Sequence, residues 1–418
     1  MHKAAFALTL SAAISTTAAL SQTANTNFVP FPKFVAGLSS AHAQDFAHRP
    51  GVALRDAAAF EEMRHYLLTF YTGVSVQHSF ALGAQVFDCV PVMQQPSVRL
   101  GKIMALDSPP PAPPTPPASA APDVETLAHQ PAWCAVGTIP MRRATLDELT
   151  RFSTLQQFFQ KSAGETGPHS DATQEHKYAY SYDYQKSDGT YTILNIWQPQ
   201  IDQHKTQVFA LSQSWDVGGS GSKTQTAETG WQVYPGKYNT AKPTLFIYWT
   251  ADDYNKTGCY NLDCTGFVQQ DNSVVLGGPL PPSVQGGKQH EIVLSYYLYK
   301  GDWWLWSGAW IGYYPTKLYK SGAMSKHATL LEFGGEVVGT TSWPPMGSGE
   351  LPSKGYEHAA YQRSVWWLDS KDNGSNTALS LDQEAPNCYK ISTTIAPGKS
   401  SWSAYPYFYF GGPGGKNC

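Results

Sequence analysis

The C-terminal part of the chain, from residue 177 onward, consists of short strand-like segments separated by glycine-rich turns. Four tyrosines alternate with other residues at its start, a spacing that places their rings on one face of a strand: Tyr178, Tyr180, Tyr182 and Tyr184. Turn signals follow at 187–189, 218–221 and 286–287, and no helical period intervenes. We therefore predict a mainly β fold, an antiparallel β-sandwich or jelly roll over residues 177–418.

The bulk composition agrees with a β-rich protein of the exported class. The chain has 418 residues, enough for two domains and a large core. Only 15% of its residues are charged, whereas 13% are aromatic. The net charge of −3 leaves no basic patch for nucleic acid. We expect a monomer that binds no nucleic acid.

The N-terminus has the pattern of an export signal. His2 and Lys3 form a short basic start, and an uncharged, small and apolar run follows over residues 4–20. Cleavage is expected near residues 18–21 or after the Ala-His-Ala run at 41–43, so residues 1–43 are assigned to the leader. A buried N-terminal helix is the competing interpretation. No later stretch of roughly 18 uncharged apolar residues occurs, so no membrane span is expected. We predict a secreted or periplasmic protein.

Six cysteines in an exported chain predict three disulfides. Six cysteines allow about 15 pairings in principle. Proximity in the sequence favours two pairs and leaves a third: Cys259–Cys264, Cys388–Cys418 and Cys89–Cys134. A zinc site at the closest pair is the alternative, but a second ligand pair of suitable spacing is missing. We expect no metal and no cofactor.

Residues 44–165 differ from the rest and predict a small α+β domain. Apolar residues recur at helical spacing from Phe60 to Tyr71, and short β segments are expected at 73–80 and 86–90. Thr145 and Glu148 then form a capping-box pattern. It begins a helix that we expect to run to about Lys161.

Two irregular segments punctuate this first half. The proline-rich run at 109–117 predicts an extended polyproline-like segment. It suits an interdomain linker or a surface insertion, and we favour the insertion because Cys89 and Cys134 flank it and would pair around it. Residues 166–176 are small and polar without a period, which predicts an exposed connector. Proteolytic nicking concentrates in such connectors.

Most familiar catalytic motifs are absent, and two glutamates remain as candidates. The chain has no His-Glu-x-x-His pattern, and the serine run at 218–222 departs from the nucleophile elbow. Glu228 lies between small residues at the start of an aromatic strand, and Glu336 follows Gly334 and Gly335 in an apolar strand-like run. Glycines let another backbone approach such an acid closely. We predict that Glu228 and Glu336 meet across one cleft.

A pair of carboxyl groups can perform hydrolysis. Two like charges held close do not both ionise easily, so one pKa falls and the other rises. The ionised member can take a proton from water, while the protonated member polarises a carbonyl and later protonates the leaving amine. Such a pair works at acidic pH.

Several short motifs of the chain resemble the neprosin family of secreted peptidases. In the C-terminal part they include Ala-Glu-Thr-Gly-Trp and Phe-Gly-Gly-Glu-Val, and they occur in family order at 227–233, 245–250, 257–269, 303–305, 311–315, 333–337 and 346–349. The N-terminal part resembles the family's activation domain at 87–90, 95–96 and 137–143.

The resemblance implies a glutamic peptidase on an antiparallel β-sandwich that cuts after proline, with Glu228 and Glu336 as its catalytic residues. It also implies that residues 44–165 are a propeptide that occupies the cleft as an intramolecular inhibitor until acid weakens its contacts. Thr229 replaces the alanine usual in the first motif. Pro168 lies inside the connector, so self-cleavage after it would suit the specificity. Proline-containing peptides or proteins are then the substrates.

Aromatic residues near the two motifs are candidates for a wall that stacks on a proline ring, with core packing as their competing role. They are Trp231, Tyr248, Trp249 and Trp303. Gln269 is a candidate for hydrogen bonding to the substrate backbone or to the oxyanion. Gly334 and Gly335 would let a substrate backbone lie close to Glu336.

Two other functions fit the same residues. Paired glutamates with aromatic platforms on a jelly roll also describe retaining glycosidases, whose carboxyl groups lie about 5–5.5 Å apart. A carbohydrate-active or carbohydrate-binding β-sandwich protein is therefore the alternative. A catalytically silent secreted binding protein of the same fold is the third.

Overall fold

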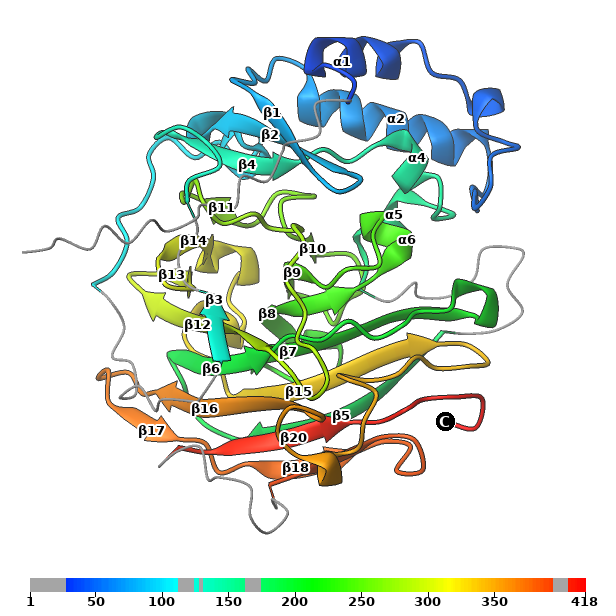
Figure 1. Cartoon of the computed structure of the whole chain (residues 1–418). Helices are drawn as coiled ribbons and strands as arrows, with labels where there is room; N and C mark the ends of the chain where they lie inside the picture. The colour runs from blue at the N-terminus through cyan, green and yellow to red at the C-terminus, as the bar shows by residue number, and fades with distance from the viewer. Residues whose placement is uncertain (1–27, 112–123, 128–130, 162–173, 394–404) are drawn as a thin grey trace, which may run out of the picture.

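The computed structural model describes residues 28–111, 124–127, 131–161, 174–393 and 405–418. The predicted fold class is confirmed, because a mainly β C-terminal part follows a small α+β N-terminal part (Figure 1). The hydrophobic run at 4–20 lies outside the described residues. Among the helices that are described, none is long and apolar enough to cross a bilayer.

Two antiparallel sheets form the C-terminal domain. The first has the strand order β10-β9-β8-β7-β15-β5-β18. Its strands are β5 (Glu175–Asp183), β7 (Gln207–Gly218), β8 (Gln225–Val233), β9 (Thr244–Thr250), β10 (Cys259–Tyr260), β15 (Leu330–Gly339) and β18 (Ser380–Gln383). We call it the front sheet.

The back sheet has the order β11-β14-β13-β12-β6-β16-β20-β19, with β17 on β16 and β3 on β12. Its strands are β3 (Val124–Leu127), β6 (Gly189–Asn195), β11 (Val268–Gln269), β12 (Gln289–Tyr299), β13 (Asp302–Trp306), β14 (Trp310–Pro315), β16 (Ala360–Leu368), β17 (Gly374–Asn376), β19 (Lys390–Ser392) and β20 (Tyr407–Gly411). β3 comes from the N-terminal half of the chain and is the parallel partner of β12.

Large aromatic side chains fill the space between the sheets. Trp231 is fully buried, and its indole nitrogen donates to the carbonyl of Asn195 on the back sheet at 2.9 Å. Gln362 reaches from the back sheet to Ser212 of β7 at 3.0 Å. Burial of each large apolar side chain contributes about 1.5–3 kcal/mol. Because side chains alternate along a strand, every second side chain of the front sheet projects from its other face, away from the back sheet.

The N-terminal domain packs two helices over a sheet of order β1-β2-β4. Its elements are α1 (Phe31–Ser39), α2 (Ala57–Tyr71), β1 (Ser79–Leu82), β2 (Gln85–Pro91), α3 (Pro96–Arg99), β4 (Thr138–Arg142), α4 (Leu146–Leu149) and α5 (Leu155–Phe159). The predicted helical spacing is confirmed in α2, which buries Phe60, Met63 and Leu67. The Asp56 carboxylate caps this helix by accepting from the Ala59 amide at 2.8 Å.

The predicted single helix from Thr145 to Lys161 is wrong in its length. The capping box of Thr145 and Glu148 is present, but α4 ends at Leu149. Thr154 begins a new helix, because its side chain accepts from the amide of Gln157. The two short helices α4 and α5 redirect the chain before Lys161.

α1 is part of the folded N-terminal domain, with Phe31 and Leu38 buried. The ring of Phe31 meets that of Tyr71 edge-on at 5.9 Å. Cleavage after residue 43 would therefore remove a helix from this core, and the leader boundary stays a prediction. The connector at 166–176 lies outside the described residues up to 173, and β5 begins at Glu175, inside its predicted end.

All three predicted disulfides are confirmed: Cys89–Cys134, Cys259–Cys264 and Cys388–Cys418. The first closes the chain around the proline-rich insertion, of which residues 112–117 lie outside the described part. The second joins β10 to the loop that follows it. Each pair links segments that the fold already holds close together.

Candidate active site

Glu228 and Glu336 lie on the two strands that flank β7. Glu228 of β8 is opposite Trp215, and Glu336 of β15 is opposite Leu211. Trp215 and Leu211 are four residues apart on β7, so both acids project from the same face of the front sheet. Neither side chain is exposed. The sheet thus joins two acids that are far apart in the sequence.

One ammonium group from the N-terminal domain bridges the two acids. Lys161 Nζ lies 2.6 Å from Glu228 Oε2 and 2.8 Å from Glu336 Oε2. Both carboxylates are consequently within a few ångströms of each other. The Lys161 side chain is only 4% exposed. Although burial lowers its pKa, the charges of Glu228 and Glu336 raise it above the ordinary value, so this lysine remains charged.

Hydrogen-bond donors surround Glu336. His176 Nδ1 lies 2.5 Å from Oε1, and the Tyr178 hydroxyl donates to the same oxygen at 3.4 Å. Gln213 Nε2 donates to Oε2 at 3.4 Å. Burial alone would raise the pKa of Glu336, but Lys161 and His176 hold it at about 2. Glu336 is therefore ionised in this structure over a wide range of pH.

Two hydroxyl groups hold Glu228 in place. Thr226 Oγ1 and the Tyr254 hydroxyl each donate to Glu228 Oε1 at 2.7 Å. Burial and the nearby charge of Glu228 raise the pKa of Tyr254 well above its ordinary value. Tyr254 therefore stays protonated and remains a donor.

A third carboxylate lies on the same face. Glu332 of β15 is opposite Trp215, the residue that also pairs with Glu228. Burial and the charges of Glu228 and Glu336 raise its pKa to about 7, and Lys161 opposes the shift. Glu332 is therefore largely protonated at acidic pH.

Residues 206–413 match the model of the neprosin family. The chain belongs to the neprosin family. That membership supports a peptidase with peptide substrates.

The solved structures include weak matches. Two of scytalido-glutamic peptidase with transition-state analogues give TM-scores of 0.30 and 0.28 at 12% and 11% identity. Each match covers 58% of this chain, and 100% and 98% of the respective peptidase chains. A homodimeric agglutinin from chicken liver gives 0.21 at 8% identity, covering 39% of this chain and 97% of its own. TM-scores this low support no conclusion about activity.

Two of the predicted substrate-binding residues of this neprosin-family chain lie on the same face as the acids. Tyr248 of β9 is opposite Glu228, and its ring stacks on that of Tyr254 at 5.9 Å. Gly334 shares the face with Glu336, two positions away on β15. A Cβ at Gly334 would come within 2.6 Å of the Tyr180 Cα, so this glycine permits β15 and β5 to approach closely.

The other predicted substrate-binding residues do not lie on the face of the two acids. Trp231, Trp249 and Gly335 point to the opposite face, because they are an odd number of positions from Glu228, Tyr248 and Glu336. A Cβ at Gly335 would meet Phe410 and Met346 inside the sandwich.

Trp303 and Gln269 belong to the back sheet. Trp303 is fully buried and donates its indole N–H to the carbonyl of Met324 at 2.7 Å. Gln269 Nε2 donates to the carbonyls of Asp271 and Val274. Neither residue contacts the two acids.

Lys161, His176, Gln213, Tyr178 and Tyr254 were not recognised as site residues from the sequence. Lys161 was predicted only as the end of a helix, and His176 as part of the connector. One signal for His176 was present, since the tyrosine alternation extends one step back to it. Nothing comparable marks Lys161, because its partners are far away in the chain.

A second group of buried charges joins the two domains beside the site. Arg142 of β4 pairs with Glu148 at 3.0 Å and with Asp263 at 3.4 Å. Lys237 of α6 (Pro235–Tyr238) pairs with Asp263 at 2.9 Å. Burial would raise the pKa of Asp263, but Lys237 and Arg142 lower it below its ordinary value. These four residues are here called the docking cluster.

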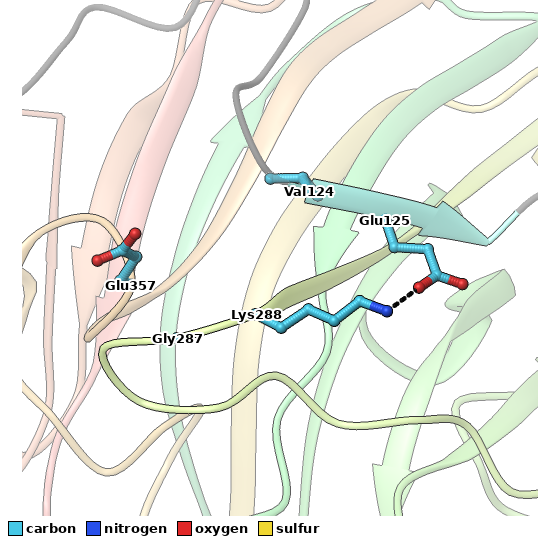
Figure 2. A pocket seen from close by; sticks show the side chains of 5 residues that line it. All are labelled: Val124, Glu125, Gly287, Lys288 and Glu357. Carbon is cyan, nitrogen blue, oxygen red and sulfur yellow. Dashed lines mark ion pairs between the residues drawn. The ribbon is translucent and has the colours of Figure 1, made fainter.

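A separate pocket lies where β3 meets β12. It is lined by Val124, Glu125, Gly287, Lys288 and Glu357, and Glu125 forms an ion pair with Lys288 (Figure 2). None of these residues contacts the acids of the front sheet. Within the described part of the chain, no group of three or more His, Cys, Asp or Glu side chains has the arrangement of a metal site.

Proposed function

We propose that this protein is a secreted glutamic endopeptidase, made as a zymogen, that works at acidic pH and cuts preferentially after proline. The carrying observation is that two buried carboxylates, Glu228 and Glu336, converge on one ammonium group of the N-terminal domain. Membership in the neprosin family supports the same assignment. Two acids that share a buried face suit hydrolysis by an activated water.

In this proposal Glu336 is the base and Glu228 the acid. His176 remains next to Glu336 after the N-terminal domain is lost and favours the ionised form of that carboxylate. Glu336 then takes a proton from a water molecule, which attacks the scissile carbonyl carbon. Protonated Glu228 donates a hydrogen bond to the carbonyl oxygen and then gives its proton to the leaving amine.

Lys161 keeps the precursor inactive in this scheme. Its ammonium lies between the two acids and pairs with both, so in this scheme it blocks the entry of a water or a carbonyl group. It comes from the N-terminal domain, directly before the connector that starts at residue 166. A cut in that connector, with Pro168 as a suitable position, would separate Lys161 from the front sheet.

Acid is expected to release this lysine. In the precursor the pKa of Glu336 is about 2, against an ordinary value of 4.5. A carboxyl group whose pKa is depressed by folding adds stability above its ordinary pKa, and this stability is lost as the pH falls toward the folded value. The contribution of Lys161 to this depression is lost on undocking, so docking of the N-terminal domain weakens as the pH falls toward about 2.

Specificity and location are proposed on separate grounds. The stacked rings of Tyr248 and Tyr254 lie beside Glu228 and offer a flat apolar wall that suits a proline ring.

Three disulfides among the described cysteines suit an oxidising compartment, so we propose secretion or export to a periplasm.

The test is cleavage of a proline-containing peptide at acidic pH after acid maturation. We expect Glu228→Gln and Glu336→Gln each to lower kcat/KM by several powers of ten, since members of a catalytic pair act as a unit. Glu350→Gln is the matched control, because this glutamate bonds to Gln285 at an exposed position. Normal turnover in either site variant contradicts the proposal. The N-terminal sequence of the matured form should begin after Lys161 and before His176, within the connector.

A further inference from the structure

Four alternating tyrosines, three in β5 and Tyr184 directly after its end, form a continuous row of rings that leads away from Glu336. Neighbouring ring centroids are 6.1, 6.1 and 5.8 Å apart along Tyr178, Tyr180, Tyr182 and Tyr184. We call these four residues the tyrosine row. The intervening residues Ala179, Ser181 and Asp183 are buried on the other face.

The row shares its face with the candidate catalytic residues. Tyr178 is directly opposite Glu336, and its hydroxyl donates to that carboxylate. Tyr180 is opposite Gly334, which has no side chain to cover its ring. Tyr182 is opposite Glu332. A chain that leaves the scissile bond over Glu336 therefore meets one tyrosine after another.

The rings become more open to a ligand toward the outer end of the row. Tyr178, Tyr180 and Tyr182 are half-buried, and Tyr184 is 72% exposed. β5 and β18 lie at the end of the molecule away from α1 and α2 (Figure 1). Aromatic side chains that remain uncovered on an otherwise well-packed sheet commonly mark a binding surface.

The backbone of β5 cannot receive the ligand by strand addition. One edge pairs with β15 over Glu175–Asp183, and the other pairs with β18 over Ala179–Tyr182. A bound peptide therefore lies across the rings and is recognised by its side chains. Flat tyrosine faces bind proline rings and aromatic side chains, and an extended proline-rich chain is rigid and loses little entropy on binding.

We propose that the tyrosine row is an extended substrate subsite that binds proline and aromatic residues several positions from the scissile bond. This subsite rests on the proposed peptidase function and defines its substrate class as long, proline-rich chains. Acidic side chains border the row, since the Tyr180 hydroxyl donates to Asp382 at 3.3 Å and Glu332 is adjacent.

The test compares short and long substrates in the acid-matured enzyme. Three peptides share one cleavage site. The short peptide has no extension, one long peptide carries six further proline-rich residues before the site, and the other carries them after it. We expect Tyr182→Ala/Tyr184→Ala to lower kcat/KM for one of the long peptides by about 10-fold, since an aromatic contact contributes about 0.5–1.5 kcal/mol. The short peptide should change by less than two-fold. Tyr182→Phe/Tyr184→Phe should retain most of the activity.

Tyr299→Ala is the matched control, since Tyr299 stacks on Tyr297 in the same alternating pattern on the back sheet. Equal losses on short and long peptides, or no loss on either, would overturn the subsite.

A binding measurement tests the subsite independently of the proposed catalytic function. Calorimetric titration of the full-length Glu336→Gln protein with the proline-rich extension alone, which need not enter the space held by Lys161, measures the row without turnover. We expect about 10-fold weaker binding when Tyr182 and Tyr184 are also replaced by alanine. Absence of cleavage by the wild-type protein would defeat the proposed function alone, whereas unchanged binding would defeat the subsite.

Discussion

Two groups of buried charges connect the N-terminal domain to the C-terminal domain, and they differ in their balance. The docking cluster has two cations and two acids, Arg142 and Lys237 against Glu148 and Asp263. At the front sheet a single lysine, Lys161, faces Glu228 and Glu336, with His176 as an additional partner. The first arrangement satisfies its own charges, whereas the second depends on a lysine that the proposed cut in the connector would remove.

This difference separates a structural contact from a functional one. A buried ion pair is costly to desolvate, and removing one partner costs about 3–5 kcal/mol because the other is left unpaired. In the docking cluster Asp263 keeps Lys237 as a partner within the C-terminal domain. At the front sheet, loss of Lys161 leaves two acids together, and that is the state in which a pair shares a proton.

Among the variants that test this difference, replacement of Lys161 should have the largest effect. In Lys161→Met the acids lose their counter-charge, so the pKa of Glu336 rises and docking of the N-terminal domain weakens by about 3–5 kcal/mol. We expect the precursor to be activated at a higher pH than the wild type. The activation pH is measured by monitoring release of the N-terminal fragment with gel electrophoresis over a pH series. An unchanged activation pH would show that Lys161 does not control latency.

The docking cluster should respond through stability rather than through turnover. Asp263→Asn leaves Arg142 and Lys237 without their shared acid, and we expect the precursor to lose about 3 kcal/mol in urea unfolding. The matured enzyme should keep its kcat within about two-fold, since Asp263 contacts neither Glu228 nor Glu336. A large loss of kcat would show that the docking cluster takes part in catalysis, and the two groups of charges would then not differ in function.

His176 should affect the pH profile of the matured enzyme. The hydrogen bond from His176 lowers the pKa of Glu336, so this carboxylate stays ionised at acidic pH. In His176→Gln the pKa of Glu336 rises, and the acid limb of kcat/KM should move to higher pH, with about 10-fold lower activity below it. His204→Gln at an exposed position is the control. A uniform loss at every pH would indicate a structural role instead.

Tyr254 should have the smallest effect. Its hydroxyl donates to Glu228 at 2.7 Å alongside that of Thr226. Tyr254→Phe removes one of two neutral donors and should lower kcat/KM by about 3- to 10-fold, in line with a hydrogen bond of about 0.5–1.5 kcal/mol. Steady-state kinetics on one proline-containing peptide measures the change. A loss as large as that of Glu228→Gln would show that Tyr254 takes part in proton donation together with Glu228.

The fold was largely predictable because its signals are local. Alternation from Tyr178 to Tyr184 indicated a strand, and the helical spacing from Phe60 to Tyr71 indicated α2. The cysteine pairs followed from proximity and elimination. The helix after Thr145 was predicted too long, because the hydroxyl of Thr154 restarts the chain as a separate helix.

The aromatic residues near the acids show the limit of such reasoning. Trp231 and Tyr248 are both large aromatic residues close to Glu228. Trp231 lies three residues after it on β8, and Tyr248 is opposite it on β9. A shift of one position reverses the face of a strand, so only the register decides that Tyr248 shares the face of Glu228 and Trp231 does not. Residue type alone could not separate them.

By itself the sequence determined a β-rich chain, its disulfides, the α+β domain in front and the two glutamates that family motifs single out. Only the tertiary structure decided what meets those glutamates. Lys161 and His176 come from opposite sides of the connector, and β7 separates the strands that carry Glu228 and Glu336. Contacts of this kind depend on which strands pair and in which register, and long-range packing sets both.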